Sequence, residues 1–351
     1  MANTDRVNYI DLAKGLGMLT IIWGHIHSGL SNTIVYAFHI PLFFFLSGLV
    51  FSPGRYDNFG VFLKRRWKGL LFPYLIFSFV TWLVWAAYSY ATHAPVESYW
   101  MPLLQTFIAQ GSEGYLVHNV PLWFVLCLFS VELIYYFTSK LPTVWNVLLC
   151  ILMGVVGAWM SVTDFFDFAA LPWSIDVALM AIPFYAAGSI VYAQVGHKRL
   201  ADWVENHKVA SVSLFILSAI LLYVGAVNNG HVSMGHDSLG NNPIVFYPTA
   251  ICGVVCFMIM CISLNNTQLV KRGGVKWFGK NSFRAMAIHN PIKGVVVVVI
   301  AKLFHSSNSE VITSVPLSIV TFVITLAITV LCMWLISWGL KKLLKRDSIL
   351  P

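Results

Sequence analysis

Residues 9–25 read YIDLAKGLGMLTIIWGH, and this segment decides the fold class. It is mostly apolar, and its length is close to the roughly 20 residues that an α-helix needs to cross a bilayer. Ionisable side chains interrupt it, among them Lys14 near its start and His25 at its end. Because such groups are costly inside a membrane, they are candidates for function. The segment therefore predicts a membrane helix that carries chemistry.

The composition extends this prediction to the whole chain. Of the 351 residues, 58% are hydrophobic and only 10% are charged, against roughly 25% charged in an ordinary soluble domain. The mean hydropathy of +0.76 leaves too few polar side chains to cover a surface in water. A soluble globule and a nucleic-acid-binding protein are excluded, and the expected solvent is the lipid bilayer.

Apolar windows of membrane-spanning length recur along the chain, and we count about ten of them. They lie at residues 10–30, 34–51, 69–92, 120–137, 144–162, 173–193, 209–228, 244–265, 282–304 and 315–340. This pattern predicts an all-α polytopic membrane protein, a bundle of about ten transmembrane helices. No loop between the windows is long enough to fold alone, so residues 1–351 are expected to form one transmembrane domain without a separate extramembrane domain.

The net charge of +8 is best explained by topology. Cations favour the cytoplasmic side of short membrane loops, and in a ten-span arrangement the loop cations share one side. The other side has no firm loop cation, since Lys293 and Lys302 lie within or at the end of the ninth window. Both termini are therefore expected in the cytoplasm. The clustered loop cations are Arg55, Lys64, Arg65, Arg66, Lys68, Lys198, Arg199, Lys208, Lys271, Arg272, Lys276 and Lys280.

The six cysteines predict neither disulfides nor a metal site. All of them lie inside apolar runs, where a thiol behaves as a small hydrophobic side chain. Cys252 and Cys256 share one helix face, but no histidine or carboxylate lies near them in the sequence. We therefore expect no metal.

Lys14 and His25 form the most informative pair of polar residues. They are eleven residues apart, which places them within roughly 20° of one helix face and about 16 Å apart along the axis. A cation at the mouth and an imidazole deep inside suit a long ligand with an anionic head and a reactive tip. For the pair alone we favour the plainer interpretation, a lysine that snorkels to the interface and a hydrogen-bonded core histidine.

The surrounding motifs favour a functional role for Lys14 and His25, because with them the chain resembles the acyltransferase-3 family of integral membrane acyltransferases. Within it the chain resembles the branch of fucose 4-O-acetylases and other polysaccharide O-acetyltransferases. The family's Arg or Lys, ten residues, then His is matched by Lys14 and His25, and its F-x-x-P by Phe38 and Pro41. Its basic R-x-x-R motif is matched only loosely, because Lys68 replaces the second Arg after Arg65. The resemblance continues through PLWFV at 121–125 and GKNSFRAMAIHNP at 279–291, so it spans the chain.

This resemblance implies the transfer of an acetyl group from cytosolic acetyl-CoA to a hydroxyl of a surface polysaccharide or its undecaprenyl-linked precursor. The enzyme would lie in the bacterial cytoplasmic membrane. His25 would be the general base, and an acyl-histidine intermediate is the alternative. Fixed cations would bind the CoA phosphates, although the basic loop can equally be an ordinary positive-inside loop. These cations are Lys14, Arg65, Arg66, Lys68, Lys280 and Arg284.

Four further residues are candidates for binding the acceptor: His39, Trp123, Asp176 and His289. Three of them also have a structural explanation. His39 can cap a helix break at Pro41, Trp123 can belong to an interfacial aromatic belt, and Asp176 can favour a helix N-terminus. Glu132 is expected to pair with a buried cation such as Arg284. A transporter or flippase that moves a glycan or metabolite without covalent chemistry is the alternative function.

Overall fold

The computed structural model describes residues 8–111, 114–163 and 171–344. Of the residues that the structure describes, 82% are helical, so the all-α prediction is confirmed. Over the described residues, nine helical segments are long and apolar enough to cross a membrane, which confirms a polytopic membrane protein. They are Leu30–Leu49, Phe59–Ala91, Val120–Thr138, Thr143–Thr163, Pro172–Gln194, Lys208–Asn229, Pro243–Leu264, Ser282–Leu303 and Val315–Gly339.

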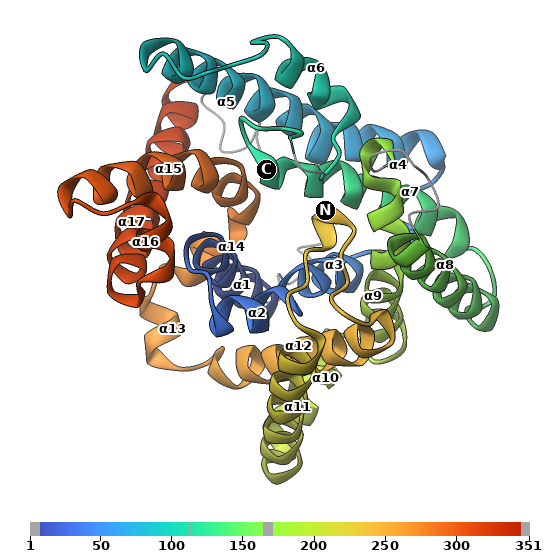
Figure 1. The fold of residues 1–351 in the computed structure, drawn as a ribbon. Coiled ribbons are helices and arrows are strands. Elements are labelled where there is room, and N and C mark those ends of the chain that lie inside the picture. The colour runs from blue at the N-terminus through green and yellow to red at the C-terminus, as the bar shows by residue number, and fades with distance from the viewer. Residues whose placement is uncertain (1–7, 112–113, 164–170, 345–351) are drawn as a thin grey trace.

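Helix α1 (Asn8–Ile26) corresponds to the first of the ten predicted spans, but it is not among these nine. Its polar residues, among them Asp11, Lys14 and His25, lower its hydropathy. The helix is nevertheless central, because it contacts α2, α3, α12, α14, α15 and α17. Figure 1 shows it near the middle of the bundle, inside a ring of longer helices. A helix that faces protein instead of lipid can carry polar side chains toward a cavity.

The other helices surround this centre (Figure 1). Helices α8 and α9 pack together on one side, α11 and α12 on the next, and α15, α16 and α17 beyond them. Their bounds are α2 (Leu30–Tyr36), α3 (His39–Leu49), α4 (Phe59–Arg66), α5 (Phe72–Ala91), α6 (Met101–Ile108), α7 (Trp123–Thr138), α8 (Thr143–Thr163), α9 (Ile175–Gln194), α10 (His197–Asn206), α11 (Lys208–Asn229), α12 (Pro243–Leu264), α13 (Gln268–Arg272), α14 (Val275–Lys280), α15 (Ser282–Leu303), α16 (Asn308–Thr313) and α17 (Val315–Leu344).

The regular α-helix is interrupted at two places that the predicted spans do not include. The second span is divided between α2 and α3 at Phe38, whose φ of −139° is not helical. Between α4 and α5 the backbone forms a π-helical turn over Trp67–Leu71. A π-turn shifts the helical face by one residue and is often found at functional sites. Here it contains Leu70, which lies on the wall of the central cavity.

Glycines allow the central helices to approach closely. A Cβ at Gly48 of α3 would collide with the main-chain oxygen of Tyr185 in α9, and one at Gly188 with that of Phe45 in α3. Likewise, a Cβ at Gly279 of α14 would collide with the main chain of Asp11 in α1. Small residues at such crossings are the usual means of tight helix packing in membranes. These contacts fix α3, α9 and α14 around the centre.

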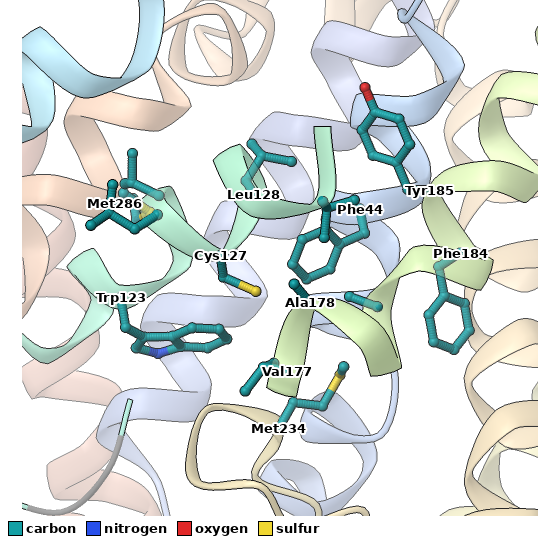
Figure 2. Packing of buried hydrophobic residues seen from close by; sticks show 14 of the residues in the cluster. Phe44, Trp123, Cys127, Leu128, Val177, Ala178, Phe184, Tyr185, Met234 and Met286 are labelled. Atoms are coloured by element: carbon teal, nitrogen blue, oxygen red, sulfur yellow. The ribbon is translucent and has the colours of Figure 1, made fainter. Parts of the chain in front are cut away.

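The core on one side of the cavity is mixed aliphatic and aromatic. Figure 2 shows Phe44 of α3 close to Cys127 and Leu128 of α7 and to Ala178 of α9, all of them buried within one cluster. The same cluster contains Met234, which belongs to the loop between α11 and α12. This loop is therefore part of the packed bundle.

Several of the cationic loops lie at one end of the bundle, which we call the basic end. The Tyr9 hydroxyl at the start of α1 lies 3.3 Å from Nδ1 of His197, at the start of α10. Lys276 of α14 donates to the main-chain oxygen of Asn265, and α14 packs against the first half of α1. The opposite end, where α1 leads into α2, is called the far end.

Candidate active site

A cavity of about 410 Å³ runs through the centre of the bundle. Its walls combine many apolar side chains with a smaller set of polar ones, which is typical of ligand-binding sites. At the basic end it is lined by Lys14, Ser47 and Ser282, and at the far end by Ser233 and His236. The other lining residues are Met18, Ile21, His25, Tyr36, His39, Ile40, Phe43, Leu70, Val120, Pro121, Trp123, Phe124, Val125, Leu128, Met234, Gly235, Phe283, Met286, Asn290 and Lys293.

Helix α1 presents one face to this cavity. Lys14, Met18, Ile21 and His25 all line it, and their spacing of four, three and four residues is that of a single helix stripe. The structure therefore places Lys14 and His25 on one wall, as their separation predicts. The cavity links a cation at the basic end with an imidazole about 16 Å away along the helix axis.

His25 lies in a cluster of aromatic and imidazole rings. Its Nδ1 is 3.2 Å from the hydroxyl of Tyr36, and its ring centroid is 5.3 Å from that of His289. The Tyr36 ring in turn lies 4.7 Å from His39 and 4.8 Å from His231. The hydroxyl holds the His25 ring in one orientation. In the tautomer that donates Nδ1–H to Tyr36, Nε2 keeps the lone pair that a general base needs.

The tautomer of His289 follows from its contacts. Its Nδ1 lies 3.1 Å and 2.9 Å from the main-chain oxygens of Ala285 and Met286. A carbonyl oxygen only accepts, so Nδ1 carries the proton and, in the neutral ring, Nε2 is an acceptor. This Nε2 is buried and has no hydrogen-bond partner among the described residues.

The hydrogen bond that a proline removes from α15 is replaced from a neighbouring loop. Pro291 has no N–H to give to the main-chain oxygen of Ala287, four residues earlier. The Asn119 side chain donates to that oxygen instead, at 2.6 Å. Asn119 is fully buried and immediately precedes the short helical turn that leads into α7. This bond fixes the segment of α15 that carries His289 and Asn290.

A buried ion pair at the basic end of the bundle corrects one expectation. Glu132 pairs with Arg66, at 2.9 Å between Oε2 and Nε, and not with Arg284. Its other oxygen accepts from the Tyr185 hydroxyl at 3.4 Å, and Lys14 lies within electrostatic range. Arg66 also donates to the Tyr56 hydroxyl at 2.7 Å. The acidic side chain thus lies between two of the cations predicted to bind CoA.

The other predicted CoA cations lie outside the cavity wall. The side chains of Arg65, Lys68 and Lys280 are exposed. Arg284 is buried and donates from Nη1 to the Ser337 hydroxyl of α17 at 2.9 Å. Lys14 alone of the six predicted cations lines the cavity. Three of the others can meet a ligand only at the surface of the basic end.

Two of the four predicted acceptor-binding residues, His39 and Trp123, line the cavity. His289 lies behind this wall, in contact with the His25 ring. Asp176 is buried at the start of α9, and its oxygens accept from the backbone N–H groups of Leu171 and Val177, each at 2.7 Å. This is the arrangement of a carboxylate that stabilises a helix N-terminus.

The loop at residues 230–242 covers the far end of the cavity. The Asn229 side chain connects the two ends of this loop. It donates to the main-chain oxygen of Leu239 at 2.7 Å and accepts from the N–H of Asn242 at 2.8 Å. The tip is fixed by a short antiparallel bridge between Ser233 and Ser238. Gly235 packs against the indole of Trp123 so closely that a Cβ would not fit.

The same loop holds a buried carboxyl group with an altered proton affinity. Burial, and to a lesser extent the nearby Asp176 carboxylate, raise the pKa of Asp237 from its usual 3.8 to about 7. Its Oδ1 is buried and has no hydrogen-bond partner among the described residues. The folded state therefore favours the protonated acid up to about pH 7.

Replacement of Asp237 by Asn should reduce the pH dependence of stability. A carboxyl with a raised pKa stabilises the fold fully below about pH 4, and this contribution is lost as the pH rises to about 7. Three pKa units correspond to roughly 4 kcal/mol. The backbone φ of 55° at this position suits Asn as well as Asp. Thermal melts of the detergent-solubilised protein between pH 4 and 8 should fall more steeply for wild type than for D237N. Parallel profiles would contradict this assignment.

The sequence prediction did not single out several residues on the cavity wall: Tyr36, His236, Asn290 and Lys293. Lys293 does carry a signal in the sequence, since it is a cation inside an apolar span. Tyr36 and His236 carried no such signal. They reach the cavity through the break between α2 and α3 and through the fold of the far-end loop.

Comparison with known proteins identifies the family of the chain. The family model described as an acyltransferase domain, that of the acyltransferase-3 family, matches residues 7–338, which is nearly the whole chain. The search of curated proteins found no match, and the search of solved structures found none either. The match indicates that this helical membrane bundle transfers acyl groups. The chain belongs to the acyltransferase-3 family and is an integral membrane acyltransferase.

Proposed function

We propose that the protein is an O-acetyltransferase of the bacterial cytoplasmic membrane. It would move an acetyl group from cytosolic acetyl-CoA to a hydroxyl of a surface polysaccharide or its lipid-linked precursor, like the fucose 4-O-acetylase branch that the sequence resembles. The observation that supports this most is that Lys14 and His25 line the same cavity. One ligand can then contact a cation with its head and an imidazole with its reactive end.

The dimensions of the cavity suit the donor. Lys14 and His25 are about 16 Å apart along α1, which is roughly the length of an extended pantetheine arm. The walls between them are largely apolar, with Met18 and Ile21 on α1. A phosphate of CoA would be held near Lys14. The Lys68 and Lys280 side chains are exposed at the same end and would bind the remaining phosphates.

The proposed reaction needs one base. The acceptor hydroxyl attacks the thioester carbonyl carbon while Nε2 of His25 takes its proton. The C–O bond forms and the C–S bond breaks. The CoA sulfur leaves as a thiolate and receives the proton from the imidazolium, so His25 returns to its neutral form. Tyr36 would hold the ring so that Nε2 faces the reacting atoms.

Lys14→Met should weaken donor binding more than it slows catalysis. The substitution keeps the approximate length of the side chain and removes the charge, and a hydrogen bond to a charged group contributes about 1.5–3 kcal/mol. We expect the KM for acetyl-CoA to rise about tenfold or more, with a smaller change in kcat. Lys208→Met, at an exposed site of the basic end, is the control and should leave KM unchanged. An equal effect of the two substitutions would remove Lys14 from the donor site.

Release of CoA from the purified protein tests the proposed function. Protein reconstituted in lipid vesicles is incubated with acetyl-CoA, and free thiol is measured over time. An acyltransferase without its acceptor should show slow hydrolysis of the thioester that depends on intact protein. A transporter or flippase should release no thiol. Mass analysis of surface glycans with and without the protein would then identify the acceptor.

A further inference from the structure

Helix α15 presents a second polar face to the cavity, in addition to that of α1. The cavity is lined on this side by Ser282, Phe283, Met286, Asn290 and Lys293. Their spacing is that of residues on one face of a helix. Helices α1 and α15 pack directly against each other. The two faces therefore form adjoining walls, with an imidazole near the far end of one and an ammonium group near the far end of the other.

Lys293 is a cation inside a membrane-spanning helix. Among the residues that the structure describes, no carboxylate lies within ion-pair distance of its ammonium group, and no hydrogen bond to it is found. Its charge is close enough to interact electrostatically with the rings of His25 and His289. An ionisable group placed at such cost within a span is expected to have a function.

Two of the other imidazoles near His25, those of His39 and His289, are poorly placed to stabilise negative charge. His39 and His289 each use Nδ1–H to donate to a main-chain oxygen, that of Val35 for His39 at 2.9 Å. In their neutral forms, Nε2 of both rings is therefore an acceptor. Lys293 is the cation that lines the cavity on this side of it, since Lys14 lies at the basic end.

We propose that Lys293 is a catalytic residue, the cation that stabilises the oxyanion formed during acyl transfer. This inference rests on the proposed function. As the acceptor oxygen bonds to the thioester carbon, the carbonyl π electrons move to the carbonyl oxygen, and the Lys293 ammonium donates a hydrogen bond to that oxygen. The hydroxyl proton goes to His25. When the carbonyl re-forms, the C–S bond breaks and the thiolate takes the proton from His25. Lys293 keeps its protons throughout.

The structure holds Lys293 in position for this role. Pro291 lies two residues earlier, and the Asn119 side chain satisfies the main-chain oxygen that the proline leaves without a partner. The helix direction at Lys293 is thus set by a buried contact instead of by lipid. A donor that is already oriented before the reaction stabilises developing charge without reorganisation, and removal of one such donor typically slows catalysis about 10²–10³-fold.

The test compares Lys293→Met with Lys293→Arg, and uses Lys302→Met as the matched control. Lys302 lies on the same helix, is exposed and does not line the cavity. We expect K293M to lower kcat about a hundredfold with little change in the KM for acetyl-CoA. K293R keeps the charge and should retain at least about a tenth of the activity, and K302M should match wild type. A K293M enzyme with at least half the wild-type kcat would overturn the proposal.

Two further comparisons keep the test decisive. If K293M does not insert or fold, Lys293→Gln against Lys293→Arg repeats the comparison, because both side chains can donate hydrogen bonds and only one is charged. Equal activity of these two variants would refute a role for the charge. If wild-type protein neither transfers acetyl groups nor hydrolyses acetyl-CoA, the proposed function itself fails. If wild type is active and His25→Gln inactive while K293M is active, only the Lys293 proposal fails.

Discussion

His25→Gln should reduce acetyl transfer about a thousandfold while the protein still inserts and folds. Glutamine approximates the size of the imidazole, but it cannot accept a proton at neutral pH, so the general-base contribution of about 10²–10⁴ is lost. The position also loses its bond to the Tyr36 hydroxyl. The measurement is the kcat for CoA release by purified protein, together with glycan acetylation in cells that carry the variant.

His207→Gln is the matched control for this substitution. His207 is exposed at the basic end and stacks on Trp203, away from the cavity. It should retain wild-type activity, and both variants should melt within a few degrees of wild type. An active His25→Gln enzyme would exclude His25 as the base. A variant that is inactive and also unfolded would require His25→Asn in its place, which is smaller and keeps a polar group.

Glu132→Gln should destabilise the fold by roughly 3–5 kcal/mol, the usual effect of removing one partner from a buried ion pair. The Arg66 side chain is only 21% exposed and that of Glu132 only 5%, so the remaining guanidinium would keep its charge with little access to water. Thermal denaturation in detergent should show a clearly lower midpoint than wild type. Glu97→Gln, at an exposed carboxylate, should leave the midpoint unchanged.

A double variant separates lost pairing from lost packing. Replacement of both Arg66 and Glu132 by methionine removes the two charges together and leaves no buried ion without a partner. The double variant should therefore be more stable than Glu132→Gln alone. If Glu132→Gln melts like the Glu97 control, the ion pair makes no contribution and the arrangement of α4 beside α7 has another origin.

The spans were predictable because their signal is local. A run of about 20 apolar residues has few folds available in lipid, since every backbone polar group must be satisfied within the segment. The same local reasoning placed Lys14 and His25 on one face, because α1 is a regular helix over both residues. It did not show that α1 is surrounded by protein. This central position explains why α1 is less apolar than the other helices.

The partners of buried groups were not predictable from local patterns. Glu132 was expected to meet Arg284, but the neighbours of α7 at this point are α9 and the π-helical turn, so Arg66 reaches it first. Arg284 instead meets Ser337 because α15 packs on α17. Such choices depend on which helices are adjacent. The bond from Asn119 to the proline bend of α15 joins positions 168 residues apart, and no sequence spacing encodes it.

The most direct test of the account is a structure of the protein with a thioether analogue of acetyl-CoA that cannot transfer its acyl group. We expect one molecule in the central cavity, with phosphate near Lys14 and the acyl carbonyl within about 4 Å of His25, close enough for one substrate hydroxyl between them. The Lys293 ammonium should face the carbonyl oxygen. An analogue bound only at the exposed basic loops, or with its acyl group away from His25, would contradict the account.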